Sequence, residues 1–121
     1  MISIIFIVLA GICKAIKDTL NFHFYSSVFE KCNHKFWNTE ISWKNKYKDG
    51  EIGVPKFFGS TTFLVFLTDA WHLFDFLQTI FSIVAIVVYS KIVFCIVDIF
   101  ILYCIFSICF ELFYRIFVMK K

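Results

Sequence analysis

Residues 60–121 read STTFLVFLTDAWHLFDFLQTIFSIVAIVVYSKIVFCIVDIFILYCIFSICFELFYRIFVMKK, and this stretch contains neither glycine nor proline. A few polar residues interrupt a sequence that is otherwise apolar. A transmembrane helix needs roughly 20 apolar residues to cross about 30 Å of hydrocarbon. The stretch is long enough for two such helices, and the polar triplet Tyr89, Ser90 and Lys91 marks the break between them. We therefore predict helices over about 61–89 and 92–118, with the hydroxyls that follow Gly59 capping the first.

The composition of the whole chain agrees with a membrane protein. Its 121 residues are 60% hydrophobic, and their mean hydropathy is +0.81. A soluble domain of this size has too much surface to hide so large an apolar fraction. The net charge of +3 is too small to indicate a nucleic-acid partner. The five cysteines form no CxxC pair, which favours reduced thiols over a disulfide or zinc site.

The first part of the chain predicts a third helix and one polar loop. Residues 2–24 begin with an apolar run and end with charged residues that can reach the membrane surface. No basic segment precedes this run, which favours a retained span over a cleaved signal peptide. Residues 26–58 mix Lys with Trp and Tyr, as is typical of a membrane–water interface. The predicted fold class is all-α: one domain, 1–121, forming a three-span transmembrane bundle with an interfacial Lys/Trp-rich loop.

The positions of the basic residues predict the topology. The 26–58 loop contains six Lys, and the C-terminal end contains Arg115, Lys120 and Lys121, whereas the N-terminus has no basic side chain. Basic residues favour the cytoplasmic side. With three spans, the loop and the C-terminus share that side and the N-terminus lies outside, in a bacterial cytoplasmic membrane. In the outer half, Asp98 is expected to pair with Lys91 or with a neighbouring chain.

This topology gathers ionisable residues from three helices in the cytoplasmic leaflet. On a helix, His72 is three residues from both Asp69 and Asp75, so either carboxylate can reach its imidazole. A carboxylate on one ring nitrogen fixes the tautomer and raises the basicity of the other nitrogen. We treat Asp69, His72 and Asp75 as candidate catalytic residues. The structural alternative, a hydrogen-bonded pair that stabilises a helix end, carries more weight from spacing alone.

Two further sets of residues could bind a ligand. Asp18, His23, Asp69 and His72 could together hold a divalent metal, although no strong metal motif is present. Basic side chains near the same leaflet could bind phosphate: Lys17, Lys44, Lys46 and Arg115. Simpler roles are an ion pair between Lys14 and Asp18 and another between Glu111 and Arg115, each four residues apart.

Two blocks carry a resemblance to a known family. Residues 42–48 (SWKNKYK) and 60–72 (STTFLVFLTDAWH) resemble a family of short bacterial membrane proteins of unknown function. The resemblance covers most of the chain from Lys14 to Gln78. It implies a stand-alone membrane protein and assigns no activity or catalytic residue.

Three functions are compatible with these features. The first is a membrane scaffold or accessory subunit that contacts lipids and associates with itself or with a partner membrane protein. The second is an interfacial enzyme that acts on a lipid headgroup or lipid-linked substrate through the Asp/His cluster. The third is an oligomeric proton or ion pathway through Asp98 and Asp69. The almost wholly apolar stretch 81–88 argues against such a pathway. The sequence favours them in that order.

Overall fold

A computed structural model describes residues 2–118, and the fold of this part of the chain is all-helical, as predicted. The three long helices are α1 (Ile2–Phe22), α4 (Ala70–Val87) and α5 (Cys95–Val118). Between α1 and α4 lie two single-turn helices, α2 (His34–Trp37) and α3 (Thr39–Ser42). Short 3-10 helices complete the connection: Phe24–Ser26, Val28–Lys31, Trp43–Lys46, Lys48–Gly50 and Val65–Leu67.

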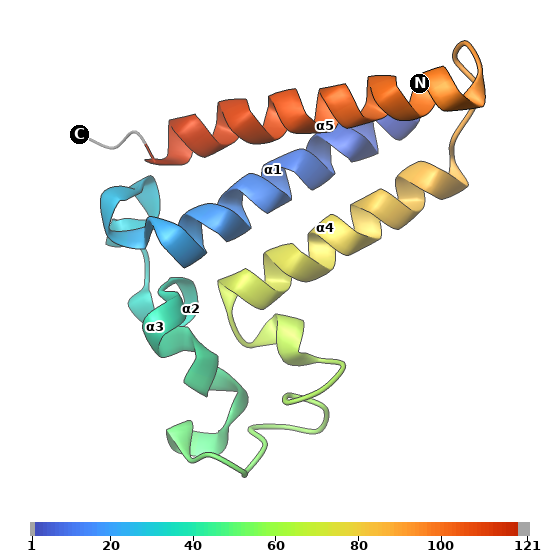
Figure 1. The fold of residues 1–121 in the computed structure, drawn as a ribbon. Coiled ribbons are helices and arrows are strands. Elements are labelled where there is room, and N and C mark those ends of the chain that lie inside the picture. Colours follow the sequence, from blue (N-terminus) through green and yellow to red (C-terminus); the bar gives the residue numbers. More distant parts are fainter. Residues whose placement is uncertain (1, 119–121) are drawn as a thin grey trace.

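Helix α1 occupies the middle of the molecule, with α4 on one side and α5 on the other (Figure 1). The start of α1 and the turn between α4 and α5 lie at one end. The 23–69 connection and the end of α5 lie at the other end, so the loop and the C-terminal helix end share a side. Lys120 and Lys121, which the topology prediction used, lie outside the described residues.

Small residues allow the central helix to approach α5 closely. Ala10, Gly11 and Ala15 of α1 are buried. A Cβ atom built on Gly11 would lie 3.0 Å from the backbone oxygen of Phe106 and 3.2 Å from the Cβ of Cys109. Close helix crossings of this kind are typical of helices that associate within membranes.

Aromatic and aliphatic side chains join α1 to α4. Phe6 and Phe81 lie with their ring centroids 6.1 Å apart. Nearer the loop, Leu20, Phe24 and Ala70 form a small buried cluster. Partly buried side chains from α1, α4 and the loop pack against it: Ile16, Phe29, Phe36, Trp37 and Phe74. This cluster anchors the connecting segment to the ends of the long helices.

The predicted start of the second helix is wrong by nine residues. Helix α4 begins at Ala70, and the hydroxyl group of Ser60 does not cap a helix. That hydroxyl donates to the carbonyl oxygen of Lys46 at 2.7 Å and accepts from the amide of Lys56 at 3.0 Å. The N-cap is Asp69, whose backbone is extended and whose side chain accepts from the amide of His72. Helix α4 therefore has 18 residues, about 27 Å of length.

Two of the long helices are long and apolar enough to cross a membrane: α4 and α5. Helix α1 is as long, but Lys14, Lys17 and Asp18 lie within it. A membrane location is thus weakly supported. Three spans, as the sequence predicts, are not shown.

Candidate functional site

The predicted contact between Asp69 and His72 is present at the start of α4. One oxygen of Asp69 (Oδ2) lies 2.7 Å from Nδ1 of His72, and the other (Oδ1) accepts from the His72 backbone amide at 2.8 Å. Asp69 is only 1% exposed. A neutral imidazole that donates from Nδ1 to the carboxylate keeps Nε2 as an acceptor. The pair therefore has the geometry of an oriented base, and it also caps the helix.

Contrary to the prediction, Asp75 does not contact His72. Its carboxylate instead accepts from Nζ of Lys17 at 2.8 Å, which links α4 to α1. The ammonium group of Lys17 also lies 5.4 Å from the centroid of the Trp71 ring. The expectation that Asp75 orients His72 is therefore wrong in this structure, because Lys17 of α1 binds the Asp75 carboxylate instead. Lys17 is correspondingly engaged within the protein.

A cavity of about 200 Å³ lies beside the Asp69–His72 pair. Its walls come from the end of α1, from α3 and its C-terminal neighbour, and from the start of α4. The other lining residues are mixed polar and aromatic: Asn21, Thr39, Ser42, Trp43 and Trp71. The predicted phosphate-binding residues lie outside this lining: Lys17, Lys44, Lys46 and Arg115. Arg115 pairs with Glu111, as expected, with 2.8 Å between Nε and Oε1.

The four predicted metal ligands are not assembled. Asp18 pairs with Lys14, and His23 lies edge-on to the ring of Tyr114 with centroids 5.7 Å apart. Within residues 2–118, no three His, Cys, Asp or Glu side chains come close enough together to hold a metal ion. Asp69 and His72 alone would supply two ligands, fewer than the three or more that zinc sites use.

Replacing Asp69 tests how much the pair stabilises α4. We expect Asp69→Ala to lower the free energy of unfolding by about 1–2 kcal/mol, because the first turn loses its N-cap. Asp69→Asn retains a capping oxygen and should lose markedly less. Thermal unfolding in mild detergent, followed by circular dichroism, measures both. Equal losses in the two variants would show that the charge, rather than the cap, is what matters.

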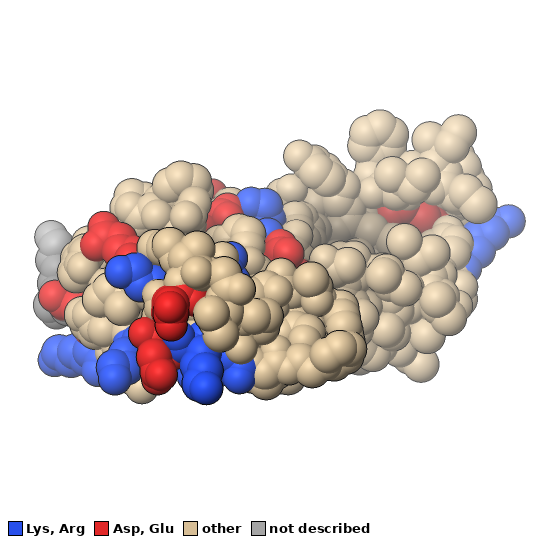
Figure 2. Space-filling view, turned by 90° about the horizontal axis from the view of Figure 1, so that it is seen from below, with Lys and Arg blue, Asp and Glu red and all other residues tan. Residues whose placement is uncertain are grey.

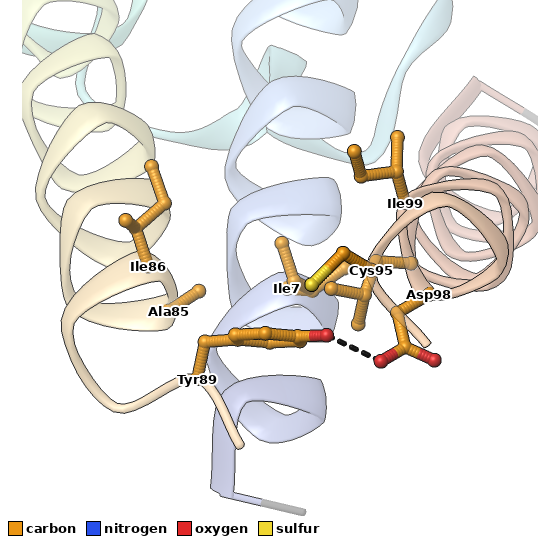
Figure 3. Close-up of a pocket in the computed structure, with 8 residues that line it drawn as sticks. Ile7, Ala85, Ile86, Tyr89, Cys95, Asp98 and Ile99 are labelled. Atoms are coloured by element: carbon orange, nitrogen blue, oxygen red, sulfur yellow. Dashed lines mark hydrogen bonds between the residues drawn. The ribbon is translucent and has the colours of Figure 1, made fainter. Parts of the chain in front are cut away.

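A second cavity, which the sequence does not indicate, lies at the opposite end of the molecule. Figure 3 shows Tyr89 reaching across from the end of α4 toward Asp98 of α5, beside Ile7 of α1. The volume is about 260 Å³. Apart from Tyr89 and Asp98, its lining is almost entirely apolar.

Asp98 is 1% exposed, and its carboxylate binds donors of the turn between α4 and α5. It accepts hydrogen bonds from the Tyr89 hydroxyl group and from the amides of Ile92 and Val93, the last two at 2.9 Å. Within residues 2–118, Asp98 forms no direct ion pair with Lys91, one of the two predicted partners. Pairing with a neighbouring chain, the other alternative, stays a prediction. Helix α5 begins at Cys95, three residues later than predicted, so this carboxylate lies one turn from the helix start.

The Tyr89 contact predicts a pH dependence of stability. The hydrogen bond to Asp98 raises the pKa of Tyr89 from 10.0 to about 12. Between these values the unfolded chain releases a proton that the folded chain retains, so the stability from this bond is complete below pH 10 and disappears as the pH approaches 12. Unfolding midpoints of the wild type and Tyr89→Phe should converge across this interval. A difference between the two unfolding midpoints that stays constant with pH would contradict the prediction.

Over residues 2–118, these features define an all-helical fold with two helices suited to crossing a membrane and with an Asp–His pair beside a cavity of mixed polar and aromatic lining. Comparison of the chain with models of known protein families, with curated proteins and with solved structures finds no match.

Proposed function

We propose that this chain is a small integral membrane protein whose helices α1, α4 and α5 each cross the membrane. We propose that it serves as a scaffold or accessory subunit. The observation that carries the proposal is the uncovered surface of α5. The residue that α5 buries is Asp98, while apolar side chains along the helix are more than half exposed: Ile96, Ile99, Phe100, Tyr103 and Ile108. In water such a surface would be costly, whereas lipid or an apolar partner covers it without penalty.

The charges within α1 are compatible with a third span. Lys14 pairs with Asp18, and Lys17 pairs with Asp75 of α4. Paired charges that face neighbouring helices are the form in which ionisable groups are tolerated in membranes. At 1.5 Å per residue, the 21 residues of α1 extend about 31 Å, enough to cross the hydrocarbon.

The distribution of charge supports an orientation. Most of the Lys and Arg side chains seen in Figure 2 gather on one half of this face, and a broad uncharged region separates them from the few charged groups near the far tip. We propose that the 26–58 loop and the C-terminus face the cytoplasm of a bacterial cell and that the N-terminus lies outside. The flanking helices α4 and α5 would then offer their apolar faces to lipid, to a second copy or to a partner membrane protein.

Cysteine labelling in intact cells tests this orientation. In a background without the other cysteines, Cys32 of the loop and a cysteine introduced by Lys91→Cys report on opposite ends of the helices. A membrane-impermeant maleimide should label the second position directly and Cys32 only after the cells are permeabilised. Direct labelling of both positions would overturn the three-span proposal.

Native mass spectrometry from mild detergent tests the scaffold role. A defined oligomer or a stoichiometric membrane protein partner is expected. A bare monomer, released from several detergents without a partner, would overturn it.

The Asp69–His72 geometry favours a second candidate, an interfacial enzyme acting on a lipid headgroup. The oriented imidazole beside a cavity of mixed polar and aromatic lining suits a general base. In that case His72→Ala should abolish turnover of a phospholipid substrate while leaving the fold intact. Loss of a copurifying phospholipid from His72→Ala in native mass spectra would support the enzyme. Identical ligand content and no turnover in either protein would leave the pair a structural cap.

A further inference from the structure

The loop contains a third cavity, separate from the Asp69–His72 site, with a volume of about 430 Å³. Small-molecule sites in proteins commonly have volumes of roughly 300–1,000 Å³. Three lysines line this cavity: Lys35 of α2, Lys44 of the 3-10 helix Trp43–Lys46, and Lys56 of the bend that follows Pro55. They come from three separate parts of the loop and therefore meet only in the folded chain.

Specific hydrogen bonds hold two of these parts together. The side-chain amide of Asn45 donates to the carbonyl oxygen of Lys35, and also to that of Thr68 at 3.1 Å. Asn45 follows Lys44 in the chain. Its side chain therefore connects the segment that carries Lys35 to the segment that carries Lys44, and both to Thr68. The arrangement of the lysines thus depends on Asn45, which is partly buried.

The third part is tied on by backbone pairing. The amide of Lys56 donates to the carbonyl oxygen of Lys46 at 3.0 Å, and the amide of Lys48 donates to that of Val54 at 2.8 Å. Tyr47 and Pro55 form an antiparallel bridge between these donors. The Ser60 hydroxyl closes the same corner through its bond to the Lys46 carbonyl oxygen. The backbone that carries the three lysines is consequently held in place by hydrogen bonds.

The charges in this cavity are unbalanced. Within residues 2–118, none of Lys35, Lys44 and Lys56 forms an ion pair with a carboxylate, and Lys44 lies 5.4 Å from the centroid of the Trp43 ring. One carboxylate, Asp49, lines the cavity. Three positive charges against one negative leave a formal charge of +2. A phosphate group, with about −1.5 to −2 charges and three acceptor oxygens at neutral pH, complements this arrangement.

We infer that the cavity formed by Lys35, Lys44 and Lys56 binds a phosphate group, carried either by a lipid headgroup or by a small soluble anion. Tyr47 adds an uncharged hydroxyl donor to the lining, whereas the amide donors of Asn45 are already engaged by the carbonyl oxygens of Lys35 and Thr68. The inference goes beyond the scaffold role and does not depend on it, because the cavity lies entirely within the loop.

Binding to the full-length protein in mild detergent tests the inference, with dioctanoyl phosphatidic acid and inorganic phosphate as probes. Lys44→Gln/Lys56→Gln removes two lining charges. Lys31→Gln/Lys48→Gln removes two charges from exposed positions of the same loop outside the lining. The lining variant should bind phosphatidic acid roughly tenfold or more weakly, because each lost contact is a charge-assisted hydrogen bond. The control variant should change affinity by less than about threefold.

A gain-of-binding variant guards against misfolding of the lining variant. Asp49→Asn removes the opposing charge and should tighten binding several-fold. Asparagine tolerates the left-handed backbone found at this position, where φ is 54°. Misfolding cannot imitate an increase in affinity.

The probes separate the two sources of the phosphate. Competition by inorganic phosphate at similar concentrations supports a soluble anion, and binding of phosphatidic acid alone supports a headgroup. No binding of either probe to the wild type, or equal losses in the lining and control variants, would overturn the inference. Unchanged or weaker binding by Asp49→Asn would overturn it as well.

Discussion

Asp98→Ala is expected to lower the midpoint of thermal unfolding by roughly 5–10 °C and to open the turn between α4 and α5. The carboxylate accepts from the Tyr89 hydroxyl and from two backbone amides, those of Ile92 and Val93. Alanine leaves all three donors without their acceptor, and the carboxylate that held them is almost fully buried. The three hydrogen bonds are partly buried, and donors that lose their acceptor where water has limited access are more costly than the bonds themselves are stabilising.

Lys91 gives this prediction a local readout. It is an exposed residue of the turn and a cleavage site for trypsin, so Asp98→Ala should be cut after Lys91 faster than the wild type. Glu111→Ala is the matched control, because it removes an exposed carboxylate from the same helix. Pairs of that kind contribute little to stability. If both variants unfold at the same temperature and are cleaved at the same rate, Asp98 does not organise the turn.

Gly11→Leu is expected to separate α1 from α5 and to destabilise the fold by about 1–3 kcal/mol. A Cβ atom at Gly11 would already approach a backbone carbonyl oxygen of α5 to 3.0 Å, and backbone cannot rotate away as a side chain can. Leucine adds three more carbon atoms at the same point, so the helices must move apart.

The reactivity of Cys13 reports on this separation, because Cys13 is buried on α1 beside the crossing. In a chain with Cys13 as its sole thiol, Gly11→Leu should accelerate modification by N-ethylmaleimide. Ile5→Phe enlarges a side chain at a 60% exposed position of the same helix and should have little effect. Unchanged thiol reactivity and an unchanged unfolding midpoint in Gly11→Leu would contradict the close crossing.

Local patterns in the sequence correctly predict that there are three long helices and that Asp69 contacts His72, although they misplace the start of α4. That contact depends only on a spacing of three residues, which a helix converts directly into proximity. The same reasoning fails for Asp75, because its partner Lys17 lies 58 positions earlier in the chain. Spacing within one helix carries no information about which face another helix will cover.

The start of α4 illustrates a different limit. Ser60 and Asp69 are both suitable N-caps, and the apolar residues between them fit a helix as well as they fit turns. The choice is made by the Lys46 carbonyl oxygen, which engages the Ser60 hydroxyl across the loop, and by the imidazole that joins Asp69 to its own helix. Neither contact is visible in a local window of sequence.

The lysine cavity was missed for the same reason. The sequence predicts phosphate binding by Lys44, yet its partners in the cavity, Lys35 and Lys56, are brought there by Asn45 and by the pairing of Tyr47 with Pro55. Asparagine in a Lys-rich loop gives no sign that its amide will bridge two distant carbonyl oxygens.

The central place of α1 has an energetic consequence. Because Gly11 of α1 meets α5 whereas Phe6 and Lys17 of α1 meet α4, the two interfaces should be thermodynamically independent. In a double-mutant cycle, Gly11→Leu at the α5 interface and Lys17→Ala at the α4 interface should have additive effects on unfolding free energy, within about 0.5 kcal/mol. The molecule would then tolerate sequence drift at one interface without compensation at the other.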